Sequence, residues 1–131
     1  MKRMIALILC VLLLAGCGGG DVSHVERVVG ASEVYTEAEI KSAMNKVKGF
    51  FMSEFEGCTL TELRYDEEKV GARQKAWAED YGAEVIVLLA TFDVDESGGD
   101  GSLNPNSTYT KYQWILAKTL FGWEIRDWGY G

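Results

Sequence analysis

The domain is organised around the segment Glu84-Val85-Ile86-Val87-Leu88-Leu89-Ala90-Thr91-Phe92-Asp93. Its residues 85–90 are all apolar and rich in β-branched side chains, which predicts a strand. A half-solvated strand alternates apolar and polar residues, whereas this one is apolar on both faces, so both faces must be covered. We expect a preceding helix to cover one face. A second helix, a curled sheet or another subunit would cover the other.

A helix with a marked start precedes this segment. Thr36 and Glu39 have the spacing of a capping box, in which each side chain binds the backbone N–H of the other residue. Gly57 suits the position just after the helix. Between them, apolar residues recur every three or four positions, namely Ile40, Met44, Val47, Phe51 and Phe55. Such a helix has one apolar face and needs a sheet on which to lie.

Residue type and spacing predict five elements after this helix, the opening strand among them. They are a strand at 59–65, a second, shorter helix at 66–80, and strands at 84–94, 107–120 and 123–128. In strand 107–120, alternation places Tyr112, Trp114 and Leu116 on one side and Tyr109, Ile115 and Ala117 on the other. The predicted fold class is α+β: a long N-terminal helix packed on a curved antiparallel sheet of about four strands, with a second shorter helix.

The N-terminus has the parts of an export signal. Lys2 and Arg3 precede the apolar run 4–14, which is too short to cross a membrane, because a transmembrane helix needs about 20 residues. Leu14-Ala15-Gly16-Cys17 then resembles the bacterial lipobox, in which the thiol receives a diacylglyceryl group and cleavage leaves that cysteine as the new N-terminus. Two acyl chains anchor a protein stably. The alternative is an ordinary secretory signal with a chance cysteine.

This signal predicts the organisation of the whole chain. We expect a lipoprotein signal peptide at 1–16, the lipidated Cys17 with a flexible tether over 17–33, and a single α+β domain at 34–131. The domain would lie on the extracytoplasmic side of the cell membrane. The only histidine, His24, falls in the tether, where a solvated linker residue is the simplest interpretation.

Charge and cysteine usage exclude several classes of partner and site. The chain of 131 residues has 13 basic and 20 acidic residues and a formal net charge of −7, which argues against binding nucleic acid or anionic lipid headgroups. Cys10 would leave with the signal, so Cys58 has no disulfide partner within the domain. It follows a helix C-terminus, which does not lower a thiol pKa, so we interpret it as a buried structural residue.

Aromatic residues are the candidate ligand-binding groups. Six aromatic residues could line a pocket between helix and sheet. Five are the candidate ligand-binding residues, namely Tyr65, Trp77, Tyr109, Trp114 and Trp128, and the sixth is Trp123. Simple filling of the core by these rings is the alternative. Catalysis there would need a base with a tuned pKa, and the domain holds no histidine, so we predict no catalytic residues and no cofactor.

The acidic loop after strand 84–94 is the candidate metal site. Oxygen ligands at Asp93, Asp95 and Ser97 followed by Gly98 match the start of a calcium loop, but the twelfth position is Asn104 instead of a glutamate. A cation site of another kind, using Asp93, Asp95 and Asp100, is one interpretation. A solvated acidic hairpin loop is the other.

Several segments together carry a resemblance to known proteins over roughly 35–130. They are the capped helix, residues 57–60, Leu63, residues 65–68, the loop 98–109 and residues 128–130. They resemble uncharacterised lipoproteins of Firmicutes, and the order of elements resembles the cystatin-like and nuclear-transport-factor-like α+β folds. The resemblance implies a fold and a host group. That family has no known function, so it implies no catalytic residues.

The sequence therefore predicts a membrane-anchored lipoprotein of the bacterial envelope that acts as a non-catalytic binding or interaction module of unknown ligand. The alternative is a small-molecule-binding or enzymatic cone-shaped domain with a pocket between helix and sheet. The doubly apolar segment 85–90 also raises a third interpretation, in which the sheet face forms a homodimer or docks to another envelope protein.

Overall fold

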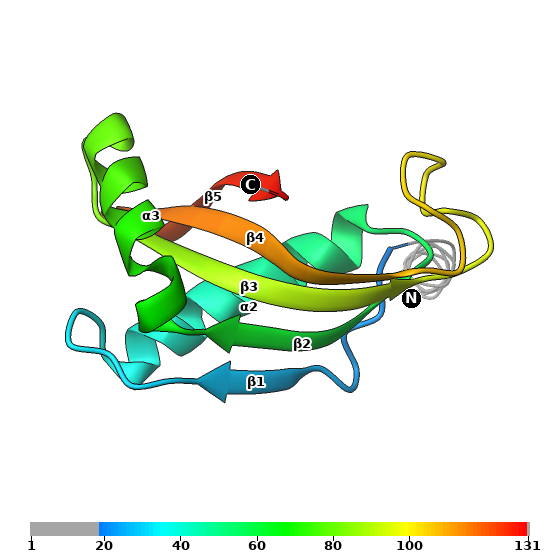
Figure 1. The fold of residues 1–131 in the computed structure, drawn as a ribbon, viewed down its shortest axis with the longest axis horizontal. Coiled ribbons are helices and arrows are strands. Elements are labelled where there is room, and N and C mark those ends of the chain that lie inside the picture. Colours follow the sequence, from blue (N-terminus) through cyan, green and yellow to red (C-terminus); the bar gives the residue numbers. More distant parts are fainter. Residues whose placement is uncertain (1–18, 131) are drawn as a thin grey trace, which may run out of the picture.

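A five-stranded mixed sheet runs through the computed structural model, which describes residues 19–130 (Figure 1). The strands lie in the order of the sequence, and two helices complete the described part of the chain. The elements are β1 (Glu26–Val29), α2 (Glu37–Glu54), β2 (Cys58–Tyr65), α3 (Glu67–Tyr81), β3 (Val85–Val94), β4 (Thr108–Thr119) and β5 (Gly122–Gly129). The α+β class is confirmed. The sheet has one strand more than expected and is mixed instead of antiparallel.

The additional strand, β1, corrects the expected tether. Residues 26–29 pair in parallel with residues 62–65 of β2, and Asp21 forms backbone hydrogen bonds with Cys58 and Leu60. Three valines at 22, 25 and 29 are partly buried against the core, so these residues gain apolar burial that a free spacer would lack. Residues 19–33 therefore belong to the domain, and the long helix is not its first element. Cys17 and the signal lie outside the described residues.

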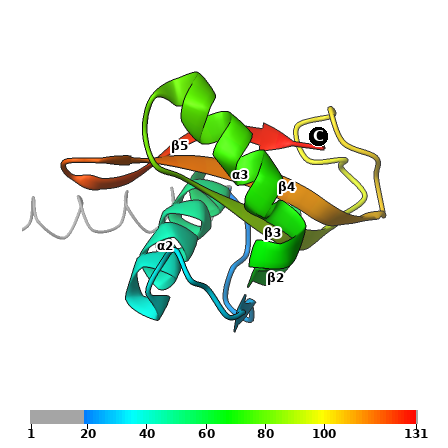
Figure 2. The ribbon, with the colours of Figure 1, turned by 60° about the vertical axis from the view of Figure 1, so that its left-hand side comes forward.

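Helix α2 begins and packs as its sequence predicts. Thr36 Oγ1 accepts a hydrogen bond from Glu39 N at 3.1 Å, and Glu39 Oε1 accepts one from Thr36 N at 3.0 Å, which completes the capping box. The helix lies against one side of the sheet, as Figure 2 shows, and its buried residues are Ile40, Ala43, Met44, Val47 and Phe51. The helix ends at Glu54, with Phe55 as its C-cap.

Both faces of β3 are covered within the chain. Leu88 pairs with Trp114, whose ring contacts the α2 side, and the neighbouring Val87 therefore faces the opposite side. Helix α3 lies on that opposite side (Figure 2) and contacts β3. All residues from 85 to 90 are buried. The second helix is thus the other cover, and the apolar character of this strand no longer favours a homodimer.

An irregularity in β4 corrects the expected side of Tyr109. Ala90 pairs with Tyr112 and Phe92 pairs with Tyr109, so β4 contains one residue more than β3 between these pairs. Lys111 adopts a left-handed backbone conformation with φ of 56° in this β-bulge. An extra residue reverses the alternation of side chains, so Tyr109 and Tyr112 share the face that α2 covers.

Candidate functional site

A continuous cluster of aromatic rings fills the space between the C-terminal end of α2 and the sheet. Its tightest pair is Phe50 and Trp128, with ring centroids 4.7 Å apart, and Trp114 stacks on Trp128 at 5.7 Å. The cluster comprises Phe50, Phe51, Phe55, Phe92, Tyr109, Tyr112, Trp114, Trp128 and Tyr130. These rings come from α2 and its C-cap, from three strands and from the residue after β5. They can meet only because the sheet brings its last strands under the end of the helix.

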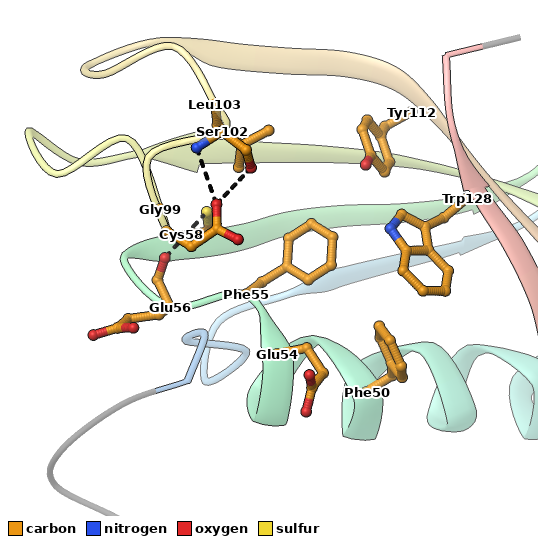
Figure 3. Close-up of a pocket in the computed structure, with 11 residues that line it drawn as sticks. Phe50, Glu54, Phe55, Glu56, Cys58, Gly99, Ser102, Leu103, Tyr112 and Trp128 are labelled. Carbon is orange, nitrogen blue, oxygen red and sulfur yellow. Dashed lines mark hydrogen bonds between the residues drawn. The ribbon is translucent and has the colours of Figure 1, made fainter.

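A pocket of about 280 Å³ opens at the solvent side of this cluster (Figure 3). Four rings form its apolar side, namely Phe50, Phe55, Tyr112 and Trp128. The loop between β3 and β4 forms the other side with Gly99, Asp100, Ser102 and Leu103, and Cys58 with Glu54 and Glu56 completes the lining. The pocket therefore lies between helix and sheet, but only at one end of the helix.

The loop that closes the pocket is held by its own hydrogen bonds. Asp95 Oδ1 accepts from Ser97 N at 2.9 Å, and Asp100 Oδ1 accepts from Ser102 N at 3.0 Å. The backbone N–H of Asp95 also donates to the carbonyl of Gly57 at 2.9 Å, which ties the loop to the turn after α2. Gly57 has a φ of +75°, and an added Cβ would lie 2.7 Å from Ser97 Oγ, so the approach needs glycine.

The pocket carries negative charge. Of its described lining residues, Glu54, Glu56 and Asp100 are acidic and none is basic. Hydrogen bonds from Ser102 hold the pKa of Asp100 below its usual range, so this carboxylate is ionised at neutral pH. Burial, assisted by the charges of Asp95 and Asp100, raises the pKa of Cys58 to about 11. The thiol is therefore neutral near pH 7 and is not an activated nucleophile.

The tyrosine in the lining is also neutral. Burial, followed by the neighbouring Tyr109 and Cys58, raises the pKa of Tyr112 to about 12. A general base near neutral pH needs a pKa close to 7, which neither this phenol nor the thiol of Cys58 has. The geometry of the pocket is therefore suited to holding a group, and these two side chains do not supply proton transfer.

The structure brings three of the five predicted ligand-binding aromatics together. Trp128 lines the pocket, Trp114 is fully buried beneath it, and Tyr109 stacks on Phe92 in the same cluster, with centroids 5.1 Å apart. The other two lie elsewhere. Tyr65 is buried in a hydrogen-bonded group with α3, and Trp77 stacks on Tyr81 along α3.

Three lining aromatics were missed by the sequence interpretation, namely Phe50, Phe55 and Tyr112. Phe55 ends the predicted apolar stripe and Phe50 lies beside it, and both differ from the core residues of α2 in being only partly buried. Tyr112 is buried like its neighbours in β4, and it reaches the lining because the loop after β3 leaves a gap beside it. Sequence spacing carries no signal for such a gap.

The three predicted metal ligands are not assembled into a metal site. Asp93 accepts a hydrogen bond from Thr108 Oγ1 at 2.6 Å, while the carboxylates of Asp95 and Asp100 bind the serines that follow each of them. Across residues 19–130, no group of three or more His, Cys, Asp or Glu side chains is placed to hold a metal ion. The acidic loop is thus organised by local turns.

Trp114 contributes an unusual polar atom to the cluster. Its Nε1 is the only buried side-chain nitrogen or oxygen in the described part of the chain that has no hydrogen-bond partner. The rings of Phe50, Phe55 and Trp128 surround the indole, with centroids 5.4 to 5.8 Å away. An unpaired buried donor costs about 1–3 kcal/mol, so aromatic packing rather than hydrogen bonding holds this side chain in place.

No family model, curated protein or solved structure matches this chain. The resemblance to Firmicutes lipoproteins therefore stays an inference from the residues themselves. Between residues 19 and 130, no helix is long and apolar enough to cross a membrane.

Proposed function

We propose that this chain is a lipoprotein of the bacterial envelope, anchored through Cys17 on the extracytoplasmic side of the membrane, whose domain binds a ligand without catalysis. The binding site is the pocket between the end of α2, strands β4 and β5, and the loop 98–103. The observation that carries the proposal is the pocket itself, about 280 Å³ in volume and walled by aromatic rings on one side. Ligand sites in proteins are typically concave and apolar, with a few polar groups that fix orientation.

The exposure of the rings supports a binding site over a filled core. Trp128 is 41% exposed and Tyr130 is 61% exposed, although both belong to the aromatic cluster. Exposed apolar rings that gather in one place are typical of interaction sites. Farther along α2 the same interface is closed, because Met44, Val47 and Phe51 are fully buried. At the C-terminal end, by contrast, Phe50 and Phe55 are only partly buried and line the pocket.

The chemistry of the lining supports binding over catalysis. Cys58 and Tyr112 keep their protons at neutral pH, because burial raises the pKa values of both groups. Glu54 and Glu56 are exposed at the rim and are solvated. An enzymatic site would need a positioned acid or base with a tuned pKa, so a non-catalytic role fits these residues better.

The proposed anchor places the pocket near the membrane. The backbone N–H of Gly20 donates to the carbonyls of Phe51 and Met52, at 3.2 and 3.0 Å. The chain therefore enters the domain beside the last turns of α2, which also supply Phe50 and Glu54 to the pocket. A lipid on Cys17 would hold this end of the domain toward the bilayer.

Replacing the candidate lipid site tests the anchor. Cys17→Ser is expected to leave the protein unprocessed or to release it from the membrane fraction, because the thiol is the acyl acceptor. Cys10→Ser is the matched control, since it removes a cysteine of the apolar run and keeps the lipobox-like motif. A Cys17→Ser protein that stays membrane-bound at mature size would contradict the anchor.

A small-molecule panel tests the binding site. The chain has four tryptophans in different surroundings, so four separate indole N–H signals are expected in the ¹H–¹⁵N NMR spectrum of the full chain in dodecyl maltoside. Cationic, neutral and anionic fragments are added in turn. We expect at least one of them to shift the signal of Trp128 while that of Trp77 on α3 stays in place. A panel that leaves Trp128 unmoved throughout would contradict a ligand site in this pocket.

A further inference from the structure

The pocket of the proposed function combines aromatic faces with acidic charge. Phe50 packs on Trp128 at 53° and Phe55 packs on Tyr112 at 86°, and all four rings line the pocket (Figure 3). The face of an aromatic ring is electrically negative and attracts cations. Walls of this kind therefore favour a positive group, provided that the rest of the lining does not oppose it.

The rest of the lining reinforces the negative potential. Glu54 lies in the last turn of α2 and Glu56 lies just beyond it, and that turn contains no basic residue. The C-terminus of a helix is the negative end of its dipole, where acidic residues are unfavourable and basic ones are normal. Two glutamates at this position oppose helix stability. When acidic residues stand where helix stability disfavours them and no neighbouring group offsets the cost, a functional reason for their charge is indicated.

Within residues 19–130, no basic side chain forms an ion pair with the carboxylates of Glu54, Glu56 or Asp100. Asp100 belongs to the loop side of the lining, whereas Glu54 and Glu56 lie at the end of α2. Two sides of the pocket therefore carry acidic residues.

We infer that this pocket binds a substituted ammonium group, with its alkyl substituents against the aromatic faces and its charge attracted by Asp100 in the lining and by the exposed Glu54 and Glu56 at the rim. This inference rests on the proposed function, since it names the ligand class of the same site. A cavity of about 280 Å³ has room for a trimethylammonium group and part of the molecule that carries it. A bare metal ion fits less well, because the described residues assemble no cluster of three metal-binding side chains.

Two sources can present this chemistry at the site. A small soluble molecule can enter from solvent, and an ammonium-bearing lipid headgroup can enter from the bilayer. The second source is available to an anchored protein, because Gly20 bonds to Phe51 and Met52 in the last turns of α2, the same turns that supply Phe50 and Glu54 to the pocket. Both sources share the ammonium group, and the experiment separates them.

The test compares choline with its neutral carbon isostere, 3,3-dimethylbutan-1-ol, on the full chain in dodecyl maltoside. Choline is expected to shift the Trp128 indole signal and to bind about tenfold more tightly than the isostere, because only choline carries the charge. Micelles containing phosphatidylcholine form a separate arm. A shift of Trp128 with the lipid alone assigns the headgroup as the source, and a shift with free choline assigns a soluble ligand.

Two variants locate the effect. Trp128→Leu removes a half-exposed ring and is expected to weaken choline binding about tenfold, whereas Trp77→Leu on α3 leaves it unchanged. Glu54→Gln removes one exposed charge at the rim without touching the core, and it is expected to weaken binding about threefold. The second variant keeps the test informative if the first fails to fold.

The outcomes separate the two proposals. Equal affinity for choline and the isostere, or a shift of Trp128 by neutral or anionic fragments only, would overturn the ammonium inference and leave the pocket as a binding site. Wild-type choline affinity in both Trp128→Leu and Glu54→Gln would also overturn it. If no fragment of any charge moves Trp128, the proposed function itself fails.

Discussion

Replacing Gln74 with leucine is expected to destabilise the domain by about 2 kcal/mol, although the side chain lies on a polar helix. Gln74 is 6% exposed and spans the point where β2 diverges from β3. Its Oε1 accepts from Val87 N at 2.9 Å, and its Nε2 donates to Tyr65 Oη at 3.1 Å. Tyr65 Oη in turn donates to Glu67 at 2.7 Å. The side chain thus replaces a strand neighbour that β3 has lost.

The magnitude follows from which groups remain unpaired. Leucine leaves the N–H of Val87 buried without a partner, which costs about 1–3 kcal/mol. Tyr65 loses a donor but keeps its bond to Glu67, so this loss is smaller, at about 1 kcal/mol. The additional apolar surface of leucine offsets about 1 kcal/mol of the total. The sum is near 2 kcal/mol.

Urea denaturation of the variant, followed by circular dichroism, measures this difference. Arg73→Leu is the matched control on the same helix, because Arg73 is exposed and its replacement is expected to change stability by less than about 0.5 kcal/mol. Native-state hydrogen exchange of the Val87 amide reports on the bond itself and should accelerate in Gln74→Leu. A variant as stable as the control, with the Val87 amide still protected, would refute the assigned role of Gln74.

Three further predictions concern the N-terminal segment, the tryptophans and alkaline pH. Gly20→Ala should lower the free energy of unfolding by about 1–3 kcal/mol, because an added Cβ would lie 2.5 Å from the ring of Phe51. The control Gly49→Ala has open space in α2 and should raise it by about 0.5–1 kcal/mol. Equal stabilities of the two variants in urea would contradict the packing of residues 19–21. Trp123→Phe should destabilise the domain by about 1 kcal/mol more than Trp114→Phe. Of these two indoles, only that of Trp123 donates a hydrogen bond through Nε1, to Glu39 O at 3.0 Å. A larger loss of stability in Trp114→Phe would contradict the unpaired indole of Trp114. Burial raises the pKa from 9.0 to about 11 for Cys58 and from 10.0 to about 12 for Tyr65 and Tyr112. The unfolded chain therefore loses these protons first, so the free energy of unfolding should fall as pH rises above about 9, and a pH titration of stability that stays flat to pH 11 would contradict their burial.

Local patterns in the sequence predict the helices and the central strands well. The capping box of Thr36 and Glu39 and the apolar spacing that follows define α2 because they depend on residues within a few turns of each other. The apolar run at 85–90 likewise identifies β3 and the need for two covers. It left the second cover open, since the choice of α3 depends on packing between distant segments.

Local sequence patterns do not predict features that depend on pairing between distant segments. Strand β1 has only four residues and lies at the edge of the sheet, where half of it is exposed, so it shows neither alternation nor an apolar run. The sequence also gives no signal for the bulge at Lys111, because lysine has no preference for a left-handed backbone conformation. That one residue decides whether Tyr109 faces the aromatic cluster.

The predicted residues of the candidate site likewise fall into those that residue type identifies and those whose position depends on long-range packing. Tyr109, Trp114 and Trp128 could be singled out as aromatics of the last strands, and the structure gathers them at one end of α2. Tyr65 and Trp77 have the same residue types and lie elsewhere, because their surroundings are set by the packing of α3. Aromatic content predicts a cluster, whereas the pocket itself depends on how the loop after β3 folds.

A calorimetric titration of the full chain with choline, run beside Trp128→Leu, decides whether this pocket is an ammonium site. Saturable binding to the wild type is expected, and about tenfold weaker binding to the variant, since the ring forms one wall of the acidic, aromatic pocket. Binding of equal strength in both proteins would contradict this assignment.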